Sequence, residues 1–293
     1  MITVMETKTY EDNREAIEAW NGVLFDKFTR FRDTLTTGLG AHGTALLERF
    51  PPKSGERILD VGCGFGDTTI TLARTVGPGG EATGVDAAAR FIEAGRSDAA
   101  KAEVTNARFL VADVEREPLG GPYDRAFARF GTMFFASPVA ALRNVRKSLA
   151  RGALFTFVVW RRKDENPCWY DAEQRVLRYV SVPEQTNAPT CGPGPFSMAS
   201  PDTVSAQLVA AGFERITFER HDCAIRLGKD VDDAIAFSIA LGPAGEVMRL
   251  AGAEAERRKP EVVASLRDLL APLVGEGGVY AKSSAWLVSA RVG

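Results

Sequence analysis

The chain has few of the residues that mark metal-binding, secreted or nucleic-acid-binding proteins. Its 293 residues include two histidines and four cysteines, and the cysteines lie far apart. Cys63, Cys168, Cys191 and Cys223 match no metal-ligand spacing, so we expect no metal and a reduced, cytoplasmic setting. The net charge is −2 and long Lys/Arg runs are missing, which disfavours nucleic acid as a partner.

Long apolar runs are also missing. None reaches the length of about 20 residues that a membrane-spanning helix needs, so we expect no membrane span. The stretch from Met1 to Trp20 carries acids and has no apolar core, unlike a secretory signal peptide. The hydrophobic share of 45% and the charged share of 25% are ordinary for a globular protein. The length favours one large α/β domain with a substantial insertion or cap.

The central part of the chain alternates between strand-like and helix-like patterns. Strands are expected near 57–61, 81–86, 107–112, 123–129 and 153–160, and helices near 67–76, 88–103 and 138–149. This alternation predicts a parallel sheet that is covered by helices on both faces. Right-handed crossovers would then bring the carboxyl ends of all these strands to one rim of the sheet.

Four regions follow from this pattern. We expect an N-terminal helical lid (1–50), a Rossmann-like core (51–160), a lid over the site (161–200) and a C-terminal part of the sheet (201–293). The third region is rich in Pro and Gly and predicts a loop, with a short helix near 168–180. The fourth is expected to hold a strand at 213–220, a helical insertion at about 230–272 and a last strand at 284–291.

One short segment is especially informative. Residues 58–69 read ILDVGCGFGDTT, in which an apolar strand carries an acid, Asp60, and leads into a G-x-G-x-G loop. Gly62, Gly64 and Gly66 let the chain turn sharply, so that backbone N–H groups can approach a ligand. A strand that passes into a helix through such a turn is where doubly wound folds bind nucleotide-like cofactors.

Asp86 ends the second expected strand, 20 residues beyond Gly66. At that separation an acid can accept hydrogen bonds from both hydroxyls of a ribose. Hydrogen bonds to a charged group contribute roughly 1.5–3 kcal/mol each. The alternative is that Asp86 only caps the helix that begins near Ala88, since Asp is a good N-cap residue.

Two further strand ends complete a pattern of four motifs. Asp113-Val114 follow the third strand, and Arg129-Phe130 follow the fourth. In order and spacing, the four motifs resemble those of class I S-adenosylmethionine (SAM)-dependent methyltransferases. The segment 129–138 is similar to that of small-molecule methyltransferases related to the ubiquinone and menaquinone biosynthesis enzymes. The resemblance covers about Gly55 to Trp160 well and the remainder loosely.

The resemblance implies a fold, a cofactor and a set of contacts. It implies a doubly wound, seven-stranded, mostly parallel sheet whose last strand runs antiparallel between the fifth and sixth. SAM would be the cofactor and S-adenosylhomocysteine (SAH) the product. Asp113 would bind the adenine amino group and Val114 would pack on the ring, unless Asp113 is only a solvated turn acid. The implied cofactor-binding residues are Asp60, Gly62, Cys63, Gly64, Gly66, Asp86, Ala87, Asp113, Val114, Arg129 and Phe130.

A small, mostly hydrophobic acceptor is suggested by the aromatic residues of the two lids. Aromatic faces suit a cationic methyl donor and a planar apolar acceptor. The expected acceptor residues are Trp20, Phe28, Phe134, Trp160, Trp169, Tyr170 and Phe196, unless they fill the lid's own core. Small-molecule acceptors fit the resemblance, and a homodimer stays open.

The sequence names no catalytic residue. Alignment of donor and acceptor alone can lower a barrier by roughly 7–11 kcal/mol, so a base is optional. Of the two histidines, His42 is expected to be a surface or packing residue, and His221 would reach the rim only if its strand points that way. Asp171, Glu173 and Tyr170 are equally weak candidates.

Two rival functions remain. A non-catalytic SAM-binding sensor or partner subunit would carry the same motifs, because they encode binding and not chemistry. An NAD-dependent dehydrogenase shares the fold and the role of Asp86, but the G-x-G-x-G spacing and Asp60 disfavour it. One departure from the family is the stretch 149–153, where a Lys-Pro-Gly-Gly turn is common and this chain has LARGA.

Overall fold

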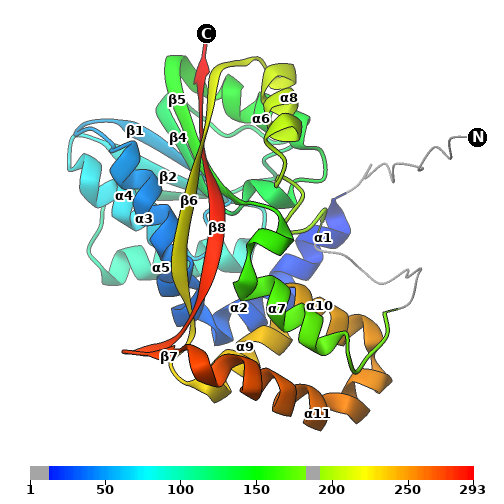
Figure 1. The fold of residues 1–293 in the computed structure, drawn as a ribbon. Coiled ribbons are helices and arrows are strands. Elements are labelled where there is room, and N and C mark those ends of the chain that lie inside the picture. The colour runs from blue at the N-terminus through cyan, green and yellow to red at the C-terminus, as the bar shows by residue number, and fades with distance from the viewer. Residues whose placement is uncertain (1–12, 183–191) are drawn as a thin grey trace, which may run out of the picture.

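A single mixed sheet organises the chain. The computed structural model describes residues 13–182 and 192–293, and the sheet order is β3-β2-β1-β4-β5-β8-β6, with β7 paired to β8 (Figure 1). The strands are β1 (Arg57–Val61), β2 (Glu81–Asp86), β3 (Ala107–Val111), β4 (Tyr123–Arg129), β5 (Leu149–Trp160), β6 (Phe213–Gly228), β7 (Val274–Gly275) and β8 (Gly278–Val292). β1 to β5 are parallel, whereas β8 runs antiparallel to β5, β6 and β7.

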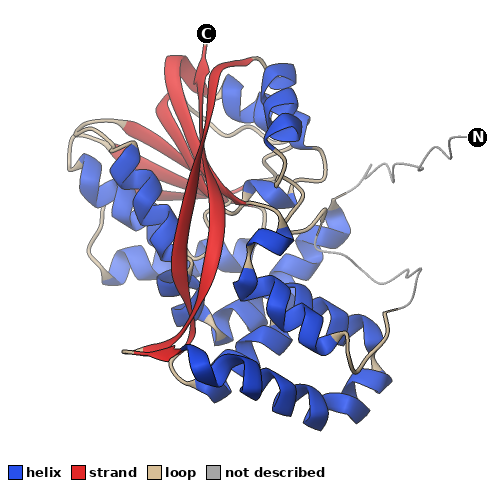
Figure 2. Ribbon diagram, in the orientation of Figure 1, coloured by secondary structure: helices blue, strands red, loops and turns tan. Residues whose placement is uncertain are grey.

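The predicted doubly wound fold is confirmed. The antiparallel β8 lies between β5 and β6, as the resemblance implied, and the short β7 is an eighth strand that the sequence did not predict. Helices lie on both sides of the sheet (Figure 2). The crossover helices are α4 (Asp67–Val76), α5 (Ala89–Lys101) and α6 (Pro138–Lys147), and α8 (Pro201–Ala211) precedes β6.

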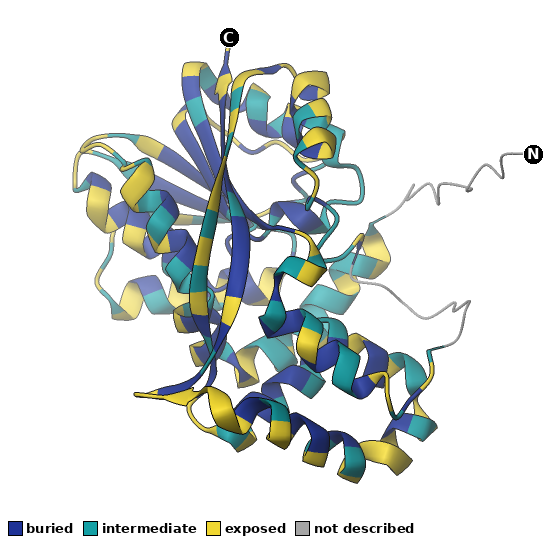
Figure 3. Ribbon diagram, in the orientation of Figure 1, coloured by how far each residue is buried: buried dark blue, intermediate teal, exposed yellow. Residues whose placement is uncertain are grey.

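The core lies between the central strands and these helices, where the strands are buried over most of their length (Figure 3). In β1 every residue after Arg57 is buried, as expected of a parallel strand covered on both faces. Phe127 of β4 and Phe155 and Phe157 of β5 are at most 1% exposed. Full burial of one such side chain contributes roughly 1.5–3 kcal/mol, so these strands hold the rim firmly in place.

β6 and β8 are longer than predicted and form an arm that extends past the rim. Ala285 of β8 pairs with both Trp160, the last residue of β5, and His221 of β6. Beyond that point β6 and β8 continue together toward a helical cap, as Figure 1 shows. The sequence predicted this strand only over 213–220, and the polar residues beyond it are tolerated because the arm has one exposed face.

The predicted insertion near 230–272 is this cap. It consists of α9 (Val231–Ala240), α10 (Gly242–Ala251) and α11 (Ala253–Leu270), followed by the short η5 (Ala271–Leu273). No single helix among the described residues is long and apolar enough to cross a membrane. α9 and α10 together pass that test of length and composition, but they are bent by 61° relative to one another.

The two predicted lids are largely helical. The N-terminal one comprises α1 (Arg14–Ala19), η1 (Trp20–Leu24), α2 (Phe25–Arg30), η2 (Thr34–Gly38) and α3 (Gly40–Arg49). The second contains η4 (Lys163–Glu165) and α7 (Pro167–Val176), close to the predicted short helix, while η3 (Thr132–Phe134) follows β4. Residues 1–12 of the first lid and 183–191 of the second, with Cys191, lie outside the described residues.

Candidate functional site

A large cavity opens at the carboxyl rim of the sheet, between the strand ends and the two lids. Its volume is about 970 Å³. Of the predicted cofactor residues, all but Gly66 line it, and of the predicted acceptor residues, all but Tyr170 do. Gly66 is instead the left-handed N-cap of α4, and Tyr170 is half-buried in α7 and does not belong to the lining.

The glycine loop forms one end of this cavity. Gly62 has φ of +67°, and a Cβ there would lie 3.1 Å from the Cα of Gly131, so two backbones meet at this point. Gly64 has φ of +53°, and no heavy atom lies within 4 Å of the position that its Cβ would take. The loop therefore leaves an open cradle of backbone at the cavity wall, which suits a ligand that approaches the chain closely.

Asp60 is almost completely buried behind this loop. It is 1% exposed, and its Oδ2 accepts a hydrogen bond of 2.6 Å from Thr69 Oγ1. Burial raises the pKa of Asp60 to about 7, although the Thr69 hydrogen bond and the nearby Arg129 oppose that shift. At neutral pH the carboxyl group is therefore close to half-protonated, and a cation in the cavity would favour its charged form.

Arg129 faces the same end of the cavity from the end of β4. Its Nη2 donates to Asp67 Oδ2 at 2.7 Å, in the first turn of α4. Gly43 of α3 leaves room for this side chain, because a Cβ at position 43 would lie 2.8 Å from Arg129 Cδ. The cavity thus has an acid, Asp60, and a cation, Arg129, near its glycine loop.

Asp86 ties the end of β2 to the glycine loop. Its Oδ2 accepts from the Gly64 N–H at 3.0 Å and its Oδ1 from the Ala88 N–H at 2.9 Å. Asp86 lines the cavity and also binds the backbone N–H of Ala88, the residue before α5, and its role toward a ribose stays a prediction. Burial raises the pKa of Asp86, while these two backbone hydrogen bonds lower it. Each carboxylate oxygen keeps a second lone pair that a hydroxyl can use.

Asp113 and Val114 lie beyond the end of β3, next to the N-terminal lid. Asp113 Oδ2 accepts a hydrogen bond of 2.9 Å from Asn13 Nδ2, and Oδ1 accepts one of 2.9 Å from the Glu115 N–H. Val114 is 4% exposed and belongs to the core. The contact with Asn13 was not predicted, because a polar residue 100 positions earlier gives no local signal.

The aromatic side chains form two groups along the cavity. Trp20, Phe28 and Phe134 make edge-to-face contacts, with Trp20 5.2 Å from Phe28 and 5.0 Å from Phe134 between ring centroids. Phe130 and Trp160 stack at 4.2 Å with an interplanar angle of 22°. These rings give the middle of the cavity an apolar surface.

The cap end of the cavity is largely apolar, with two charged pairs, Lys163–Glu173 and Arg249–Glu246. Trp169 packs between Trp160 and Phe237 of α9, each at 5.8 Å between ring centroids. Lys163 donates to Glu173 Oε1 at 2.8 Å, and Glu173 is only 7% exposed. The sequence analysis missed the cap residues Phe237, Leu241 and Gly242 that line this end, together with Leu35 and Leu39.

The candidate bases differ in whether they line the cavity. Glu173 lines the cavity, whereas Asp171 is exposed and Tyr170 lies outside the lining. His42 is fully buried, and neither it nor His221 belongs to the described lining of this cavity. His42 is therefore inside the fold and outside this cavity. Cys63 is buried against Gly84, which is consistent with a small residue in a tight loop.

Residues 52–188 match the family model of a methyltransferase domain. Aklanonic acid methyltransferase DauC of Streptomyces sp. (strain C5) is 31% identical over 118 residues, which are 39% of this chain and 53% of that protein. Demethylmenaquinone methyltransferase of Staphylococcus aureus (strain JH9) is 32% identical over 103 residues, 35% of this chain and 42% of that protein. The chain thus spans about half the length of these curated relatives.

Solved structures resemble more of the chain. The YcgJ protein from Bacillus subtilis superposes with a TM-score of 0.54 at 19% identity, covering 87% of this chain and 97% of that one. The [4+2]-cyclase SpnF superposes with a TM-score of 0.51 at 18% identity, covering 86% of this chain and 82% of that one. At such identities the likeness shows the fold alone, and the function has to be argued from the site.

Proposed function

We propose that this protein transfers a methyl group from SAM to a small, mostly apolar acceptor, because residues 52–188 match the model of a methyltransferase domain, as the strand-end motifs predicted. The observation that carries the proposal is one continuous cavity of about 970 Å³, which includes the glycine loop and continues into a largely apolar region under the cap. A protein that only bound SAM as a sensor would not need the part of the cavity under the cap. A reducing cytoplasm as its setting, and a homodimer, remain predictions.

Polar residues that line the cavity would bind the polar groups of SAM. The open backbone at Gly64 would receive the cofactor closely, and Asp86 would accept the ribose hydroxyls on its free lone pairs. Asp113 would accept from the adenine amino group while Val114 packs against the ring. Asp60 and Arg129 would face the ammonium and carboxylate groups of the methionine part.

The reaction requires little proton transfer by the protein. SAM supplies an electrophilic methyl group on a sulfonium, and displacement needs a nucleophile in line with the S–CH₃ bond. The stacked Phe130 and Trp160 would orient a planar acceptor and exclude water, and their faces suit the cationic donor. Glu173 and Glu246 are acids at the acceptor end of the cavity, and we assign neither a catalytic role.

Calorimetric titration with SAM, SAH and NADH tests the proposal. We expect micromolar binding of SAM and SAH and none of NADH. Asp86→Ala should weaken SAM binding at least tenfold, which corresponds to about 1.4 kcal/mol. Glu219→Ala is the matched control, because Glu219 is an exposed acid of β6 that pairs with Arg49 away from the cavity.

Binding of NADH in place of SAM would overturn the proposal in favour of a dehydrogenase. Binding of SAM without methyl transfer to any of a panel of phenols, quinols and carboxylic acids would favour the SAM-binding sensor. The panel is read by mass spectrometry as a gain of one methyl group. This product measurement is required because the fold also occurs in a [4+2]-cyclase.

A further inference from the structure

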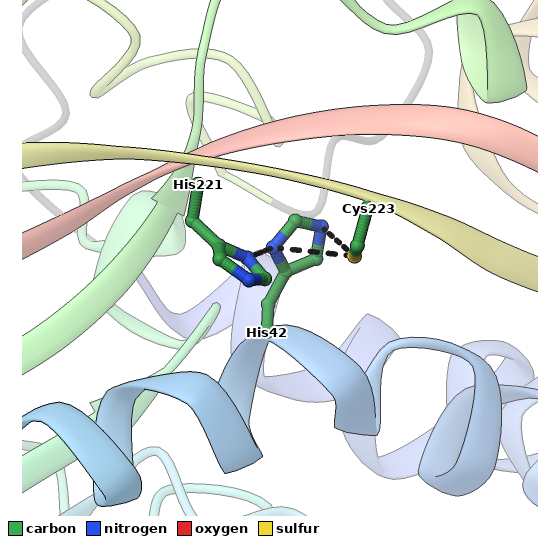
Figure 4. Close-up of side chains that lie close together, drawn as sticks. All are labelled: His42, His221 and Cys223. Atoms are coloured by element: carbon green, nitrogen blue, oxygen red, sulfur yellow. Dashed lines mark hydrogen bonds between the residues drawn. The ribbon is translucent and has the colours of Figure 1, made fainter.

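Three side chains with metal-binding atoms converge outside the cavity. His42 projects from α3 toward β6, and His221 and Cys223, two residues apart on one face of β6, project toward it (Figure 4). His42 Nδ1 lies 2.9 Å from His221 Nδ1, and Cys223 Sγ lies 3.8 Å from His42 Nδ1 and 3.4 Å from its Nε2. One ligand atom from each residue lies within 4.8 Å of the other two.

Ser283 of β8 fixes the tautomer of His42. Its hydroxyl donates to the Cys223 carbonyl at 2.9 Å, so its oxygen accepts from the Nε2–H of His42 at 2.8 Å. The proton of the neutral imidazole is then on Nε2 and a lone pair is on Nδ1, which faces His221. Metal-ligating histidines are usually held in this way, with the other ring nitrogen donating to an oxygen.

The three side chains differ in burial. His42 is fully buried, whereas His221 and Cys223 are half-buried, so solvent and a small ion can reach the cluster at these two residues.

We propose that His42, His221 and Cys223 bind a borderline-soft divalent transition-metal ion, with zinc as the type case, through two Nδ1 atoms and one Sγ. Two imidazole nitrogens and one thiolate are a ligand set that suits zinc. In a tetrahedral zinc site two nitrogens lie about 3.3 Å apart, and a nitrogen and a sulfur about 3.6 Å apart. The observed 2.9 Å and 3.8 Å differ from these values by a few tenths of an ångström.

Binding rearranges two protons. The Cys223 thiol loses its proton to solvent as the S–metal bond forms, since the thiolate is the ligand. The hydrogen between the two Nδ1 atoms moves to Nε2 of His221, which stays neutral. A small rotation of the His42 ring toward Cys223 completes the three bonds, and a water molecule from the half-exposed side can take the fourth position.

The bound ion would tie the N-terminal lid to the arm. α3 and β6 are separated by 179 residues at this point, and the His42 ring packs edge-on against Phe130 and Trp160 at 5.8 Å and 5.4 Å. The metal would therefore support the wall on which the acceptor is proposed to stack. The expectation of a metal-free chain came from cysteine spacing, and such spacing cannot detect ligands this far apart in sequence.

Cobalt(II) titration of the chelator-treated full chain tests this proposal without reference to methyl transfer. We expect one equivalent of cobalt to give visible d–d bands and a near-ultraviolet thiolate-to-cobalt band, both removed by added zinc. Cys223→Ser should abolish the thiolate band, and His221→Gln should weaken cobalt binding at least tenfold. Both positions are half-exposed, so these variants should fold.

Cys168→Ala is the matched control, because Cys168 is the nearby buried thiol outside the three-residue group. Its cobalt spectrum should equal that of the wild type. A thiolate band that survives Cys223→Ser overturns the proposal, as does a folded wild-type protein, verified by circular dichroism, that takes up no cobalt. In the second case the cluster is a hydrogen-bonded packing network.

Discussion

Thr69 Oγ1 donates a hydrogen bond of 2.6 Å to Oδ2 of Asp60, between the first turn of α4 and the end of β1. Thr69 thus satisfies one oxygen of the Asp60 carboxyl group, and Asp60 is 1% exposed. Burial outweighs it and raises the pKa of Asp60 to about 7. The acid that precedes the glycine loop is therefore poised to change its charge near neutral pH.

The first prediction is that SAM binding releases a proton from Asp60. A cationic ligand in the cavity favours the carboxylate, so affinity for SAM should be full above pH 7 and fall as pH drops through 7. The limiting slope is about tenfold per pH unit, as linkage requires for one proton. Calorimetry at pH 6.5 in two buffers of different ionisation enthalpy should give different apparent enthalpies.

Asp60→Asn provides the comparison for that experiment. Asn can still accept the hydrogen bond from Thr69, but it cannot titrate. We expect weaker SAM binding with a flatter pH profile, and any slope that remains belongs to SAM or to other groups. Equal slopes in the two proteins would show that Asp60 does not release the proton.

The second prediction concerns the stability of the ligand-free protein. The pKa of Asp60 in the folded state is above its usual value of 3.8, so its protonated form favours folding. That contribution is complete below pH 4 and is lost as pH rises to 7, with a cost on the order of 4 kcal/mol. Asp60→Asn should therefore gain stability over the wild type as pH increases from 4 to 8.

Thermal or urea unfolding at pH 4.5 and pH 8 measures this difference. The gain of the variant should be several degrees larger at pH 8. A gain that is the same at both values would mean that Asp60 is ionised in the folded protein throughout. If the gain is larger at pH 8, Asp60→Asn combines higher stability with weaker SAM binding, as expected when a buried charge is kept for function.

Local signals predicted the strand ends around the glycine loop, and long-range packing decided the rest of the cavity. β1 and β2 have the bounds that their patterns predicted, and Asp86 lies where its distance from Gly66 implied. Each of these features depends on residues close together in sequence. Phe237, by contrast, reaches the cavity only because the cap folds back from the end of the arm. No local sequence pattern predicts the angle between the cap and the arm.

The same reason explains the two polar contacts that were missed. Asn13 meets Asp113 across 100 positions, and His42 meets His221 across 179. A lone polar residue on an apolar helix gives no indication of its partner. The sequence could therefore place His42 inside or on the surface of the fold, but it could not predict a cluster.

The third prediction separates backbone strain from ligand exclusion in the glycine loop. Gly64→Ala places a methyl group in the open cradle, so it should abolish SAM binding while the protein stays folded. The left-handed conformation, φ of +53°, costs an alanine about 1–2 kcal/mol. Gly55→Ala is the control, since its φ is +83° and its Cβ would also meet no atom within 4 Å.

Circular dichroism melting and calorimetry with SAM are the measurements. Gly55 precedes β1 and does not line the cavity, so Gly55→Ala should lose similar stability and keep its SAM affinity within about twofold. Retention of wild-type affinity by Gly64→Ala would mean that the cofactor does not approach this part of the loop.

The fourth prediction concerns the acceptor end of the cavity. Gly242, at the start of α10, has φ of +72°, and a Cβ there would lie 2.7 Å from Cε3 of Trp169. The indole is rigid and packed against Trp160 and Phe237, so Gly242→Ala must move it or the cap. Overpacking of this kind costs roughly 1–3 kcal/mol. We expect SAM affinity to stay unchanged and the acceptor KM to rise.

Gly152→Ala isolates the packing contribution in that experiment. Gly152 is in β5 outside the cavity lining and has φ of +77°, close to that of Gly242, but its Cβ would meet no atom within 4 Å. Both variants carry the strain of a left-handed alanine, and only Gly242→Ala carries the clash with Trp169. Unfolding midpoints should therefore fall further for Gly242→Ala, and only that variant should change the quenching of tryptophan fluorescence by bound acceptor. Equal losses in the two variants would mean that Trp169 moves freely, and the aromatic wall would then not be the rigid surface on which acceptor stacking depends.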